Sequence, residues 1–213
     1  MSGSDENSVK VLLTDINELI RTETLYTKSE AYWLNTGIEL LTFIRTLLAS
    51  PEKVNQWTPK EYNSDRLSLL ESIFIVLEHV PNPNRLLPDD LLSITASHET
   101  SIAVSIYELA FTRCSSMISL SLGDRFSFIQ KLLIRNLFGG SFLRSFLASD
   151  LYIFILRIIH PHRQMAMCQI IMNLCRRAPN EALVKGAALI IRIKHPVINF
   201  ENPKYQDLLE FTS

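Results

Sequence analysis

Apolar residues recur along most of this chain at intervals of three and four residues, the spacing that places them on one face of an α-helix. In the first such segment Leu12, Ile16 and Leu19 share a face, and Ser8 precedes them as a suitable N-cap. The alternation of apolar and polar residues that is typical of a half-buried strand is almost absent. The pattern therefore predicts an all-α protein.

Prolines, glycines and capping residues divide this pattern into separate helices. The segment 51–63 is predicted to be a loop. Gly123 is predicted to end one helix, and the pair Gly139–Gly140 to end the next in a left-handed turn. The first predicted helix begins at Ser8, and a short one begins at Pro88. A further helix over 65–80 has its cap at Asn63 or Ser64. The other predicted helices cover residues 29–50, 98–121, 124–138, 141–160, 163–178, 180–194 and 203–211.

The most apolar long stretch is Leu133–Arg163. A membrane-spanning helix needs about 20 consecutive apolar residues with few or no charges. This stretch is interrupted by four charged residues, namely Arg135, Arg144, Asp150 and Arg157. We therefore expect no membrane span, and we interpret the stretch as a helical hairpin that turns at the two glycines.

The chain of 213 residues is long enough for one substantial core. We expect a disordered tail over residues 1–7, a single all-helical domain over 8–196 and a C-terminal extension over 197–213 that holds the last short helix. The three cysteines lack the spacing of a disulfide framework, and the first residues lack the pattern of a secretory signal. These features favour an intracellular protein, cytoplasmic or nuclear.

The predicted helices at Ser29, Ser64, His98, Ser141 and Asn180 begin 35, 34, 43 and 39 residues apart, near the period of two-helix repeats. Over residues 29–194 the chain resembles the HEAT and armadillo class of α-solenoids, in which antiparallel helical hairpins stack. The resemblance is architectural, because no repeat consensus recurs. It implies a binding platform for proteins or nucleic acids. An irregular multi-helix bundle is the alternative fold.

Motifs for catalysis are absent from the sequence: it contains no Gly-x-Ser-x-Gly, no His-Glu-x-x-His and no glycine-rich phosphate loop. Cys168 and Cys175 lie seven residues apart on one helical face, after His160 and His162. These residue types suit zinc, but their spacing matches no established zinc site, and packing is the favoured interpretation. We therefore expect no enzyme, no cofactor and no metal.

Charge is distributed unevenly, although the net charge is only -1. Residues 1–106 hold 8 Lys and Arg against 15 Asp and Glu, whereas residues 107–213 hold 13 against 7. Within Arg113–Lys194 there are 12 basic and 3 acidic residues. Such a segment attracts an anionic partner.

Six basic residues in this segment are the candidate partner-binding residues: Lys131, Arg135, Arg144, Arg176, Arg177 and Arg192. An acidic protein surface and nucleic acid both suit them, while simple solvation of outer helix faces is the interpretation without a partner. We expect a non-catalytic scaffold or adaptor subunit of an intracellular complex, with a nucleic-acid-binding helical repeat as the alternative. Because only 20% of residues are charged, we also expect exposed apolar surface and self-association.

Overall fold

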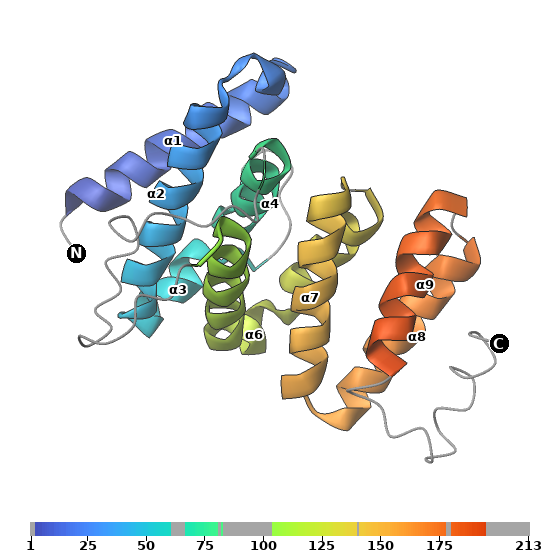
Figure 1. Ribbon diagram of the computed structural model, residues 1–213. Helices are drawn as coiled ribbons and strands as arrows, with labels where there is room; N and C mark the ends of the chain where they lie inside the picture. Colours follow the sequence, from blue (N-terminus) through green and yellow to red (C-terminus); the bar gives the residue numbers. More distant parts are fainter. Residues whose placement is uncertain are drawn as a thin grey trace. The chain divides into compact units, whose positions relative to one another are not determined.

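The computed structural model describes residues 3–60, 67–80, 82, 104–139, 141–177 and 180–194. The elements in these ranges are eight α-helices and one short 3-10 helix, so the prediction of an all-α protein is confirmed (Figure 1). Two compact units, Met1–Ile129 and Gln130–Ser213, divide the chain at a point inside one long helix. The single domain expected over 8–196 stays a prediction.

The described part of the first unit is helical. They are α1 (Gly3–Arg21), η1 (Leu25–Thr27), α2 (Glu30–Leu48), α3 (Pro51–Trp57), α4 (Leu69–His79) and the first part of α6 (Ile106–Gly139). Helices α1 and α2 form an antiparallel pair, and α2 also packs against α4 (Figure 1). The pairing is close because α2 carries Gly37, where an added Cβ would lie 2.9 Å from Cγ1 of Val76 on α4.

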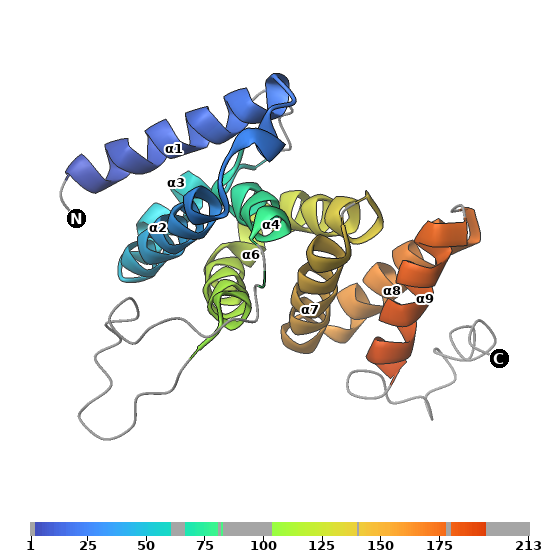
Figure 2. The ribbon, with the colours of Figure 1, turned by 45° about the horizontal axis from the view of Figure 1, so that its top comes forward.

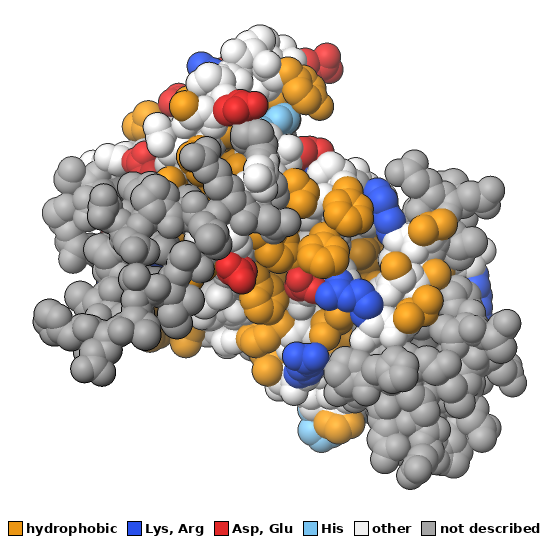
Figure 3. All heavy atoms as spheres, in the orientation of Figure 1, with side chains coloured by type: hydrophobic (Ala, Val, Ile, Leu, Met, Phe, Trp, Pro, Cys, Tyr) orange, Lys and Arg blue, Asp and Glu red, His pale blue; other side chains and the backbone are white. Residues whose placement is uncertain are grey.

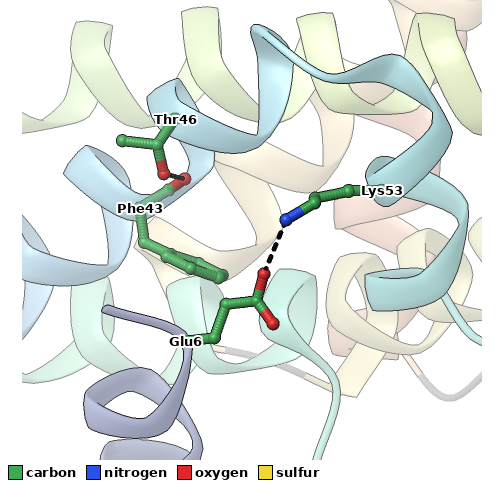
Figure 4. Close-up of polar contacts among 4 residues, drawn as sticks. All are labelled: Glu6, Phe43, Thr46 and Lys53. Carbon is green, nitrogen blue, oxygen red and sulfur yellow. Dashed lines mark hydrogen bonds and ion pairs between the residues drawn. The ribbon is translucent and has the colours of Figure 1, made fainter. Parts of the chain in front are cut away.

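Polar contacts occur both between and within the helices of the first unit. Lys53 on α3 pairs with Glu6 on α1 at 2.9 Å, and the Thr46 hydroxyl donates a hydrogen bond to the Phe43 carbonyl within α2 (Figure 4). The hydrogen bond and charge of Lys53 hold the pKa of Glu6 below its ordinary value. Arg125 on α6 donates from Nε to the carbonyl of Thr58, so its guanidinium caps the end of α3.

The second unit contains the end of α6 and three further helices, α7 (Phe142–Ile158), α8 (Pro161–Arg177) and α9 (Asn180–Lys194). Helices α8 and α9 lie side by side as an antiparallel pair, and α9 also packs against α7 (Figure 2). The buried Tyr152 hydroxyl on α7 donates a hydrogen bond to the Met167 carbonyl on α8 at 2.9 Å. Gly186 permits the close contact of α8 and α9, because an added Cβ would overlap Sγ of Cys175.

Several predicted boundaries are confirmed. Helix α6 ends at Gly139, α7 follows Ser141, and α9 covers the predicted range 180–194. Gly139 itself does not take a left-handed conformation. The helix from Pro88, the helix over 203–211 and the extension 197–213 lie outside the described residues.

Other predicted boundaries are wrong. The segment 51–63 is not all loop, because Pro51 is suited to the first position of a helix and begins α3. Gly123 does not end a helix: α6 runs through it, and the apolar residues on both sides of it continue to pack. A single glycine weakens a helix by only about 1 kcal/mol, which such packing overcomes.

Several helix starts also differ from the sequence prediction, and α6 begins at Ile106 instead of His98. Helix α4 begins at Leu69, later than predicted, because the Ser68 side chain accepts a hydrogen bond from the Glu71 amide and so acts as the N-cap. Helix α1 begins at Gly3, so it includes part of the segment assigned to a tail. None of the helices in the described part of the chain is long and apolar enough to span a membrane.

Candidate partner-binding surface

All six basic residues that the sequence analysis selected belong to the second unit. Lys131 and Arg135 lie one turn apart on α6, and both side chains are exposed. Arg144 is partly buried on α7. The remaining three are on the last two helices: Arg176 and Arg177 on α8, and Arg192 on α9.

Arg176 and Arg177 occupy the last turn of α8, and both are exposed. Cations at this position interact favourably with the negative end of the helix dipole. Among the described residues, neither arginine forms an ion pair, and neither does Lys131. These three side chains therefore present their charge to solvent.

Arg192 connects two helices. Its guanidinium pairs with the Asp150 carboxylate on α7 and donates a hydrogen bond to the Ser149 hydroxyl at 2.7 Å. The same guanidinium lies 5.1 Å from the ring centroid of Phe146. Arg192 thus holds α9 against α7, and its charge is compensated by Asp150.

Two aromatic residues on α7 are exposed, and the sequence analysis did not select them. Phe142 is 76% exposed and Phe146 42% exposed. Their rings stack with centroids 5.9 Å apart and an angle of 20° between planes. Figure 3 shows hydrophobic and basic side chains next to one another over α7. We define Phe142, Phe146 and Arg192 as the α7 patch.

A sequence signal for this patch exists in α7 itself. Apolar residues occur on every side of this helix, which leaves it without a continuous polar face. Such a helix either is covered all round or exposes apolar side chains. In contrast, the aromatic residue Phe128 on α6 is buried.

The two units carry net charges of opposite sign. Residues 1–129 hold 10 Lys and Arg against 17 Asp and Glu, a net charge of -7, whereas residues 130–213 hold 11 against 5, a net charge of +6. The excess of positive charge thus belongs to the unit that carries the α7 patch. This combination favours an anionic partner surface over a cationic one.

The cysteines of the second unit are packing residues in this structure. Cys168 and Cys175 are both buried and free, and Cys175 contacts the backbone of α9 at Gly186. Burial raises the pKa of the Cys168 thiol to about 11, so the thiol stays protonated at neutral pH. No group of three or more His, Cys, Asp or Glu within the described ranges could hold a metal ion.

A cleft of about 420 Å³ lies in the first unit between α1 and the end of α3. Its polar lining includes Lys10, Asn17 and Gln56, and its apolar lining includes Leu13 and Trp57. Among the described residues of that lining, Lys10 is the one that carries a charge. The described part of the lining therefore shows no pair of acid and base of the kind that proton-transfer chemistry needs.

The structure thus defines an all-helical protein whose second unit exposes a cationic and aromatic surface. The chain belongs to the family described as a domain of unknown function, DUF4487, which matches residues 12–208 and so includes residues of both units. Comparison with curated proteins and with solved structures gives no match.

Proposed function

We propose that this protein is a non-catalytic scaffold or adaptor subunit of an intracellular complex, and that it binds an acidic protein surface through the second unit. The observation that carries the proposal is the α7 patch, in which Phe142, a residue that is 76% exposed, stacks its ring on that of Phe146. Aromatic side chains and arginine are the residues most enriched at the energetic centres of protein interfaces.

The geometry of the α7 patch supports a binding role because its parts are held in place before a partner arrives. Asp150 and Ser149 fix the guanidinium of Arg192, and that guanidinium lies over Phe146. A preorganised patch loses little side-chain entropy when it binds. The exposed cations Lys131, Arg176 and Arg177 then supply the charge that steers an acidic partner.

The finer fold that suits this function is a short α-solenoid of stacked helical hairpins, similar to HEAT and armadillo proteins. The antiparallel pairs α1–α2 and α8–α9 support it, since each is a hairpin with a short connection. Solenoids of this class bind partners along extended surfaces.

The test replaces both rings of the α7 patch, Phe142→Ser with Phe146→Ser, in the tagged full-length protein. Removal of an aromatic centre costs an interface about 2 kcal/mol or more, so recovery of a specific copurifying protein should fall at least about 10-fold. The matched control is Ile158→Ser on the same helix, which is 46% exposed and lies outside the patch.

Melting temperatures of both variants establish that the fold is intact. Equal recovery of every copurifying protein by the wild type, the double variant and the Ile158→Ser control would contradict the proposal. Loss of partners in the control as well would show that the patch has no special role.

The alternative function is nucleic-acid binding by the second unit, which its net charge of +6 favours. Phosphate contacts release counterions, so affinity for fluorescent DNA or RNA should fall steeply between 50 and 200 mM salt, by about 10³-fold if six phosphates are contacted. A salt-independent or absent signal rejects this alternative. The α7 patch does not favour it, because its one cation is already paired with Asp150.

A further inference from the structure

Helix α9 exposes an apolar stripe on the side that faces away from its own core. Val184 is 68% exposed and Ile191 is 56% exposed. They lie two helical turns apart, and the exposed residue Ala188 is between them. Figure 3 shows hydrophobic side chains at the surface over α9. We call Val184, Ala188 and Ile191 the α9 stripe.

The α9 stripe is not explained by the packing of α9 against its neighbours. The opposite side of the helix makes that contact, through the buried residues Gly186 and Leu189. When helical pairs stack, an end helix normally turns a polar face to solvent. An end helix with an apolar outer face instead indicates that a further element covers it.

We propose that the α9 stripe is the docking site for the chain's own residues 203–211. This segment reads Pro-Lys-Tyr-Gln-Asp-Leu-Leu-Glu-Phe, and its apolar residues Tyr205, Leu208 and Leu209 have the i, i+3, i+4 spacing of one helical face. It lies outside the described residues.

Chain length permits this docking. Residues 195–202 connect the end of α9 to the segment and can span about 26 Å when extended. Helix α9 has 15 residues, a length of about 22 Å. The connection is therefore long enough for the segment to return along the whole helix.

The charges of the two segments and the extent of the family match both support residues 203–211 as the segment that covers the α9 stripe. Residues 195–213 contain three acidic residues and one lysine, whereas residues 161–194, which include α8 and α9, contain six basic residues and one acidic residue. The family match extends to residue 208, so it includes Tyr205 and Leu208 together with α9. The proposal is independent of the function proposed above, since it concerns a different face of the second unit.

The experiment measures how fast a thiol reagent modifies a cysteine placed in the α9 stripe, Ile191→Cys, in the full-length chain. The three native cysteines are buried, so they react slowly with the reagent and give only a background signal. The reference is Asn173→Cys, at an exposed position on α8. Docking predicts that the thiol at position 191 reacts at least about 10-fold more slowly than the thiol at position 173.

A second change then removes the proposed occupant without altering charge. Leu208→Ser with Leu209→Ser should raise the reaction rate at position 191 to that at position 173, whereas Gln206→Ser on the polar side of the segment should leave it unchanged. Melting temperatures confirm that each variant is folded.

Two outcomes overturn the proposal. Equal rates at positions 191 and 173 in the chain with Leu208 and Leu209 intact would show that nothing covers the α9 stripe. If the slow reaction at position 191 becomes fast on dilution and is unaffected by the Leu208→Ser, Leu209→Ser change, a second copy of the chain covers the α9 stripe instead.

Discussion

At the residue scale, burial alone determines the thiol pKa and the reactivity of two cysteines. Cys114 is 0% exposed and Cys168 is 2% exposed, and burial raises their thiol pKa values to about 12 and about 11. A thiolate is the nucleophilic form of cysteine, so neither side chain is reactive at neutral pH. Their role in the described structure is to fill space between helices.

These pKa values make stability depend on alkaline pH. The unfolded thiols lose their protons near pH 9, while the folded thiols keep theirs to about pH 11 or 12, so the unfolded state binds fewer protons above pH 9. The free energy of unfolding should therefore fall above pH 9, by about 1 kcal/mol per pH unit for each thiol. Urea unfolding at pH 8, 9 and 10 measures this slope.

Substitution of the thiols provides the control. Cys114→Ala with Cys168→Ala should lower stability at every pH, because it removes buried volume, but it should flatten the decline above pH 9. Tyr152 is also buried and its pKa is raised, so it adds to the decline near pH 10, but it is present in both proteins and its effect cancels when their slopes are compared. An unchanged slope in the double variant would contradict the assignment.

Two helical glycines have opposite roles at the scale of elements, although each is a helix-weakening residue in sequence. Gly186 on α9 is buried where an added Cβ would overlap Sγ of Cys175 and lie 3.0 Å from the ring of Phe138. At Gly123 in α6 an added Cβ would meet nothing within 4 Å. The first glycine is needed for packing, and the second is not.

We therefore expect Gly186→Ala to lower the free energy of unfolding by about 1 to 3 kcal/mol, because it overpacks the α8–α9 contact. Gly123→Ala is the matched control, and it should raise stability by up to about 1 kcal/mol, since alanine favours a helix interior. Urea denaturation of both variants checks the pair. A destabilised Gly123→Ala variant would indicate that α6 is interrupted at this residue.

The same elements show how far sequence alone predicts this fold. Periodicity predicts the helical class and the positions of α2, α8 and α9, because their apolar faces and caps are local features. It fails at Gly123, because packing on both sides of this glycine favours continuation of the helix. It fails at Pro51, because proline is also suited to the first position of a helix. The sequence predicted the candidate cations but not the exposure of Phe142, which depends on which side of α7 its neighbours leave uncovered.

Opposite net charges on the two units are the main feature at the scale of the whole molecule. The first unit has a net charge of -7 and the second unit has a net charge of +6. The net charge of -1 for the whole chain therefore represents neither unit. An approaching acidic surface is attracted to the second unit and repelled by the first, and salt screens both effects over a Debye length of about 8 Å at 0.15 M. This polarity favours one orientation of a charged partner.

The last prediction tests whether the exposed cations of α6 contribute to binding. Lys131→Glu with Arg135→Glu reverses two exposed charges, and such surface changes usually alter stability by about 0.5 kcal/mol or less. Melting temperature should therefore stay nearly constant, while recovery of copurifying partners falls and becomes less sensitive to salt. Lys28→Glu with Lys60→Glu changes the net charge equally in the first unit and should leave recovery intact. If partners remain bound to the Lys131→Glu, Arg135→Glu variant while its melting temperature drops sharply, these cations stabilise the fold and the partner-binding assignment is wrong.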